Sequence, residues 1–182
     1  MHKTSSSTRN QFTRKEYDIK VFDLELFDTY YYIKRSTIVE KIVFNNRTFY
    51  AKFERKNEPL TPLILQQHFQ RDYTIAIPLL KEQHTNYLVI EYKGEEHVQF
   101  QALIQHLFKK LNICNYHIYQ GRSKEKLQVF IFVSDISLED AHHRLAHISS
   151  LLEEKMSKKW KTLPSLLLPE SYNIITLPYD YI

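Results

Sequence analysis

The sequence has little glycine, a single cysteine and no long apolar run, and each shortage excludes a class of protein. Only Gly94 and Gly121 occur among 182 residues, whereas ~7% glycine is usual. The glycine-rich loops that hold phosphates in P-loop and dinucleotide-binding enzymes are therefore absent. Both glycines are expected where the backbone needs a positive φ or a close approach.

The shortage of cysteine and of apolar runs also bounds where the protein is found. Cys114 is the only cysteine, so no disulfide can form within the chain. No apolar run approaches the ~20 residues that span a membrane, and no apolar signal-peptide core follows Met1. These absences predict a cytoplasmic protein that is not embedded in a membrane.

Positive charge is concentrated at the start of the chain. The net charge is +4, of which residues 1–16 carry +3 and the remaining 166 residues carry +1. Residues 1–16 also contain many Ser and Thr, which predicts a disordered basic tail. The rest of the chain gives no general electrostatic case for nucleic acid, so any basic patch there must be local.

Residues 17–80 are predicted to form a β-rich segment with one short helix. Asn45-Asn46 lies between two alternating runs and predicts a hairpin turn. Thr61 as the N-cap and Pro62 in the first turn predict a short helix over "PLTPLILQQHF". "YTIAIPLL" is predicted to be a strand.

Residues 81–182 alternate more clearly between strands and helices. The strands are "YLVIEY", "NYHIYQ", "LQVFIFV" and "YNIITLPY", and the helices are "EEHVQFQALIQHLFKKL" and "SLEDAHHRLAHISSLLEEKMSKKW". This β-α-β-β-α-β order is the split βαβ, or ferredoxin-like, plan, with both helices on one sheet face. We therefore predict an α+β fold in which the β-rich N-terminal half packs on a palm-like unit as one compact domain.

Strand alternation divides the side chains of this predicted sheet between two faces. The face away from the helices carries Tyr87, Val89, Glu91, Lys93, Lys126, Gln128, Phe130 and Phe132. Its apolar members have two explanations. Residues 17–80 pack over them, since exposed apolar patches are unusual on a monomer, or Phe130 belongs to a base-stacking surface for single strands.

Residues 73–182 resemble the palm of the archaeo-eukaryotic primase superfamily. The resemblance rests on "TIAIPLLKEQHTNYLVIEYKG", "YQGRSKEKLQVFIF", "SLEDAHHRLAHISSLLEEK" and "NIITLPY", which occur in that order. The metal-binding acids of that palm would fall on Glu91 and Lys93, and its motif histidine on Gln128. Two-metal phosphoryl transfer needs several carboxylates. The resemblance therefore implies vestigial positions, no catalytic residues, no metal and no polymerase activity.

The whole chain also resembles an uncharacterised family of epsilonproteobacterial hypothetical proteins. Its N-terminal part, with "YAKFERKNEPLTPLILQQHF" and "YTIAIPL", is similar to a domain of unknown function. This resemblance implies a bacterial cytoplasmic protein and supplies no activity.

Local basic clusters provide the candidate binding residues. Arg122, Lys124 and Lys126 lie on the predicted turn "GRSKEK" beside Lys93, and a second cluster surrounds Trp160 with Lys155, Lys158, Lys159 and Lys161. The plain explanation is solvated charge. The functional one is a phosphate track along the sheet, with Phe130 as an apolar contact. His143 and His147, one helical turn apart, are weighed as metal ligands, and the solvated helix face is preferred.

The favoured interpretation is a non-catalytic binding or adaptor protein without a cofactor, whose partner is nucleic acid or a protein. One alternative is a metal-dependent nucleotidyl-transfer or phosphate-ester enzyme that uses Glu91 with Glu95, Asp135 or Asp180. Another is a protein–protein scaffold whose open face or free sheet edge binds a partner strand.

Overall fold

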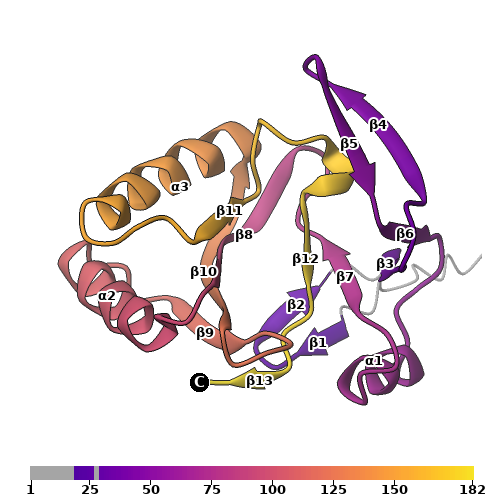
Figure 1. Ribbon diagram of the computed structural model, residues 1–182, viewed down its shortest axis with the longest axis horizontal. Helices are drawn as coiled ribbons and strands as arrows, with labels where there is room; N and C mark the ends of the chain where they lie inside the picture. The colour runs from indigo at the N-terminus through magenta and orange to yellow at the C-terminus, as the bar shows by residue number, and fades with distance from the viewer. Residues whose placement is uncertain (1–18, 27–28) are drawn as a thin grey trace, which may run out of the picture.

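The computed structural model describes residues 19–26 and 29–182. The predicted basic tail, residues 1–16, lies outside the described residues. The described chain is a β-rich α+β fold with three helices and antiparallel sheets, as predicted at this level. Figure 1 shows two helices, α2 and α3, on one side of a sheet and further strands on the other side. No helix in the described part is both long and apolar enough to cross a membrane.

The larger sheet has five strands in the order β11-β8-β10-β9-β13. These are β8 (His84–Lys93), β9 (Tyr116–Gln120), β10 (Lys126–Ser137), β11 (Trp160–Leu163) and β13 (Asp180–Tyr181), and all neighbours are antiparallel. Helix α2 (His97–Lys110) connects β8 to β9, with β10 between them in the sheet. Helix α3 (Leu138–Glu153) connects β10 to β11, with β8 between them.

The helices cover one face of this sheet, as the alternation predicts. Leu88, Ile90 and Tyr92 of β8 pack in one apolar cluster with Leu127 and Val129 of β10 and with the inner sides of α2 and α3. Helix α3 begins where Ser137 accepts a hydrogen bond from the Asp140 N–H at 3.1 Å and so caps the helix N-terminus.

A smaller sheet has the order β12-β7-β3-β6. Its strands are β3 (Tyr31–Lys34), β6 (Phe53–Lys56), β7 (Ile75–Pro78) and β12 (Ile174–Thr176). The segment "YNIITLPY", predicted to be the last strand of the palm-like unit, contains β12 and pairs instead with β7. The place beside β8 belongs to β11, which was not predicted as a strand: its first residue, Trp160, was expected to end the preceding helix.

Trp160 explains why β11, and not the segment that contains β12, lies beside β8. Helix α3 ends at Glu153, and Trp160 is buried beside α2 and α3, 5.9 Å from the Phe100 ring, with its indole N–H donating to Ser149 Oγ at 3.0 Å. Anchoring a large aromatic side chain there fixes "WKTL" as an edge strand.

The remaining elements are short. They are β1 (Ile19–Val21), β2 (Leu24–Leu26), β4 (Glu40–Phe44), β5 (Arg47–Ala51), α1 (Pro62–Phe69), the 3-10 turn η1 (Glu170–Tyr172) and the connecting turns. Asn45 and Asn46 have φ values of 48° and 59°, so the predicted turn is confirmed, and it closes a β4–β5 hairpin that extends away from the body in Figure 1. The predicted N-cap Thr61 accepts the Ile64 N–H at 3.3 Å.

The two sheets pack against each other through apolar side chains. Val89 and Phe130 from the larger sheet share a buried cluster with Ile33, Ile75 and Ile175 from the smaller one. The rings of Tyr87 and Tyr119 approach Phe130 edge-on, with centroids 5.9 and 5.6 Å away. The N-terminal segment therefore covers the apolar part of this face, which is the first of the two explanations.

Candidate functional site

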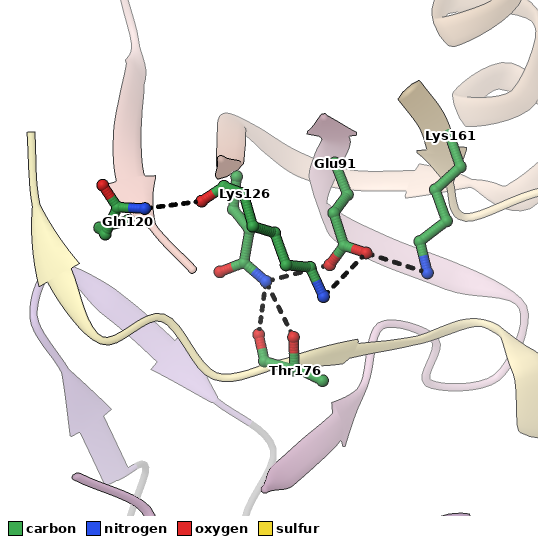
Figure 2. A network of polar contacts seen from close by, with 6 residues as sticks. Glu91, Gln120, Lys126, Lys161 and Thr176 are labelled. Carbon is green, nitrogen blue, oxygen red and sulfur yellow. Dashed lines mark hydrogen bonds and ion pairs between the residues drawn. The ribbon is translucent and has the colours of Figure 1, made fainter. Parts of the chain in front are cut away.

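The strand register determines which side chains surround Glu91. Glu91 on β8 is opposite Gln128 on β10 and opposite Lys161 on β11. Directly opposed residues project from the same sheet face, so Gln128 and Lys161 flank Glu91. Lys126 lies two residues before Gln128 on the same face. Figure 2 shows the Lys126 and Lys161 side chains converging on the Glu91 carboxylate.

Glu91 is a buried carboxylate between two ammonium groups. Lys161 Nζ and Lys126 Nζ lie 3.2 and 3.3 Å from Glu91 Oε1, and Gln128 donates to Oε2 at 3.2 Å. Burial alone would raise the pKa of Glu91, but the two lysine charges and the Gln128 hydrogen bond hold it below its ordinary value. The carboxylate is therefore ionised at neutral pH and balances only one of the two lysines.

Gln128 connects the two sheets. Its side-chain amide also donates to the Thr176 carbonyl oxygen at 2.9 Å and to Thr176 Oγ1 at 3.0 Å, and Thr176 belongs to β12 of the smaller sheet. Gln128 is fully buried. It therefore acts as a polar tie next to the apolar contact of Phe130.

A cavity of about 390 Å³ lies next to Glu91, between the two sheets. Five of its lining side chains are basic: Lys34, Lys52, Arg122, Lys126 and Lys161. Among the described lining residues only Glu91 is acidic, so five cations against one carboxylate leave a net charge of +4. The other lining side chains are mostly aromatic or small and polar, including Tyr50, Phe53, Thr74, Ser171, Tyr172, Thr176 and Tyr179.

Three of the five cations stand apart from the Glu91 cluster. Lys34 ends β3, Lys52 lies between β5 and β6, and Arg122 lies on the β9–β10 turn. The Arg122 guanidinium donates to Thr74 Oγ1 at 2.6 Å, which fixes the turn against the start of β7. Within the described chain, none of these three forms an ion pair with a carboxylate. Their charge is available to an anion in the cavity.

Gly121 supports this arrangement through a close approach, one of its two predicted uses. A Cβ at Gly121 would lie 2.8 Å from Lys126 Cγ, and neither glycine has a positive φ. A side chain at position 121 would therefore displace the lysine that faces Glu91.

Two of the tyrosines that line the cavity, Tyr172 and Tyr179, pack against other aromatic rings. Tyr172 of η1 meets Phe49 of the β4–β5 hairpin with ring centroids 5.0 Å apart, and Tyr179 packs on the ring of buried His68 at 4.2 Å. The Tyr179 hydroxyl is buried and has no hydrogen-bond partner among the described residues.

The structure separates the predicted basic residues into two pairs. Arg122 and Lys126 line the cavity, whereas Lys93 and Lys124 are exposed and outside its lining. The prediction of Phe130 as an accessible apolar contact is wrong, because its side chain is 0% exposed beneath the smaller sheet. A stacking surface at Phe130 is thus excluded in this conformation.

The proposed acidic partners of Glu91 lie elsewhere. Glu95, Asp135 and Asp180 do not line the cavity. Asp135 borders a second cavity, of about 400 Å³, together with residues 81, 82 and 84–86. His143 and His147 are exposed on α3, and the described residues contain no group of three or more side chains placed to hold a metal ion.

Sequence reasoning missed Lys34 and Lys52 as site residues and noted Lys161 only within a charge cluster. Successive side chains of a strand point to different faces. Because Trp160 faces the helices, alternation along "WKTL" would have placed Lys161 on the other face, with Glu91. Lys34 and Lys52 give no such local signal, because their position depends on how distant strands pair.

Comparison with known proteins adds one finding. Residues 15–86 match the model of a family described as "Domain of unknown function (DUF1882)", which fits the expected uncharacterised domain and assigns no activity. The matched segment contributes Lys34, Lys52 and Thr74 to the cavity, whereas Glu91, Arg122, Lys126 and Lys161 lie outside it. A search of the curated proteins found no match to the chain.

Proposed function

We propose that the protein is a non-catalytic nucleic-acid-binding protein whose basic cavity holds phosphate groups of the bound strand. The observation that carries this proposal is the cavity lining, with a net charge of +4 and aromatic side chains. Phosphate contacts with Lys and Arg supply much of the affinity for nucleic acid, and aromatic rings stack on bases without regard to sequence.

The strand order supports a primase-like origin of this site. The elements β8, α2, β9, β10, α3 and β11, with the sheet order β11-β8-β10-β9, correspond to the split βαβ plan once β11 replaces the expected last strand. On this interpretation Glu91 and Gln128 are remnants of a metal and phosphate site. Two ammonium groups within 3.3 Å of Glu91 occupy the space in which a metal ion would bind a carboxylate.

A matched pair of variants on one turn tests the binding site. Arg122→Gln and Lys124→Gln remove the same charge from neighbouring positions, but only Arg122 lines the cavity. Fluorescence anisotropy with labelled single-stranded DNA and RNA over a salt series should show about tenfold weaker binding for Arg122→Gln and a salt slope lower by ~1. Lys124→Gln should bind within about threefold of the wild type. Equal losses in both variants, or no salt-dependent binding by the wild type, would overturn the proposal.

Glu91→Gln separates binding from catalysis. The substitution keeps the shape of the side chain and removes the one negative charge that repels a phosphate in the cavity. We expect about three- to tenfold tighter strand binding in the same assay. An enzyme that uses Glu91 behaves in the opposite way. Nucleotide incorporation or phosphate release by the wild type with Mg²⁺, abolished by Glu91→Gln, would replace this proposal with the enzyme alternative.

A further inference from the structure

The cavity carries more positive charge than a single phosphodiester group would balance. We propose that the cavity recognises the terminal phosphate of a nucleotide, at the end of a strand or on a free nucleotide, in preference to the phosphodiesters inside a strand. This inference rests on the proposed function, because both place a nucleotide phosphate in the same cavity.

The first argument is charge. A phosphodiester carries one negative charge, whereas a terminal phosphate monoester carries about −1.5 to −2 at neutral pH. Glu91 already balances one of the two lysines beside it, and Lys34, Lys52 and Arg122 have no carboxylate partner within the described chain. These cations line one cavity and repel each other, so a multiply charged group relieves more of that repulsion than a singly charged one.

The second argument is shape. A volume of about 390 Å³ lies at the small end of the range for pockets that hold one small ligand. The lining comes from both sheets, from the chain before β6 and from η1, so the cavity is a recess between layers rather than a track along one surface. A strand end needs only to enter such a space, whereas an internal segment must also pass out of it.

The third argument is the supply of hydrogen-bond donors. Thr74 Oγ1 accepts from Arg122 and Thr176 Oγ1 accepts from Gln128, so each hydroxyl keeps its own hydrogen to donate. Lys34 and Lys52 line the same cavity, and their ammonium groups add further donors. A terminal phosphate presents three acceptor oxygens, one more than a diester leaves unesterified.

The test compares oligonucleotides of one sequence that carry a 5′-hydroxyl, a 5′-phosphate or a 3′-phosphate, by anisotropy with the full chain. We expect one phosphate-ended strand to bind about tenfold or more tightly than the hydroxyl-ended strand. Lys34→Gln and Lys52→Gln should reduce this ratio towards one. Lys41→Gln, which removes an exposed charge on the β4–β5 hairpin outside the cavity, should leave it unchanged. Thermal unfolding confirms that each variant is folded.

Free nucleoside mono- and triphosphates are tested as competitors and as direct ligands. Binding of a free nucleotide that Lys34→Gln weakens, without strand binding, would support terminal-phosphate recognition and overturn the nucleic-acid proposal. Equal binding of all three strands, weakened alike by Arg122→Gln, would overturn terminal-phosphate recognition and leave the proposed function in place. Binding of neither strands nor nucleotides would overturn both.

Discussion

The two faces of the five-stranded sheet are covered to different degrees. Helices α2 and α3 cover one face, and most of its side chains are apolar and buried there. The opposite face is apolar where the smaller sheet packs on it, at residues that include Tyr87, Val89, Tyr119, Phe130 and Leu163. At Glu91 and Gln128, one step of alternation further along the register, it is charged or polar and borders the cavity. A packed core thus fixes the position of the polar site beside it.

The largest loss of stability is expected from a substitution at Phe130, on the face that the smaller sheet covers. Phe130→Ala should lower the free energy of unfolding by about 3–5 kcal/mol, because a fully buried ring leaves a cavity between the sheets. Urea unfolding measures it. Val43→Ala, at a hairpin position that is 71% exposed, is the control and should change stability by less than about 0.5 kcal/mol. A Phe130→Ala cost below about 1 kcal/mol would mean that this face is uncovered in solution.

The next largest effect is a pH dependence of stability that arises from His68 in α1. His68 is buried, its Nδ1 accepts the Ile75 N–H at 3.2 Å, and its Nε2 lies 3.1 Å from the Leu177 carbonyl oxygen. Burial lowers the pKa of His68 to about 4, although the backbone carbonyls of Leu177 and Pro178 act in the opposite direction.

The sign follows from proton binding. With an unfolded pKa near 6.5, the unfolded chain binds the proton first as the pH falls, so stability is lost between about pH 6.5 and pH 4. The loss from His68 is at most about 3 kcal/mol. Urea unfolding over a pH series should show it, and His68→Gln should remove it. An unchanged pH dependence in His68→Gln would contradict the buried neutral imidazole.

A smaller loss of stability is expected from removing the hydrogen bonds of Gln128, which connect the two sheets. Gln128→Leu removes donors from Glu91 and from Thr176 and should cost about 1–3 kcal/mol, because buried acceptors lose their partners. Thr176→Val removes only the contact to Oγ1 and should cost about 1 kcal/mol or less. Both are measured by urea unfolding. If Gln128→Leu stabilised the protein, the hydrogen bonds would not be what holds the sheets together at this end.

Much of this difference between the faces was predictable from the sequence, and the cavity was not. Alternation in "YLVIEY" and "LQVFIFV" assigned Ile90 and Val129 to the helices and Glu91 and Gln128 to the other face, because period-2 patterning is local. Local alternation could not predict that β11 pairs with β8 and β12 with β7. Both strands are short, and each pairs with a strand far away in the sequence. Lys34 and Lys52 also remained hidden, because their places in the cavity depend on pairings between strands distant in the sequence.

Strand β12 has a consequence for how the molecule is made. The four-stranded sheet takes β3, β6 and β7 from within the matched segment 15–86, but its edge strand comes from residues 174–176. As the chain leaves the ribosome, β7 is an unpaired apolar edge until that segment emerges, and such edges invite aggregation. Thr176 and Tyr179 arrive in the same step. The cavity is therefore one of the last features to form, and a nascent chain that stopped at residue 173 would carry all five of its cations without the enclosure that makes them a site.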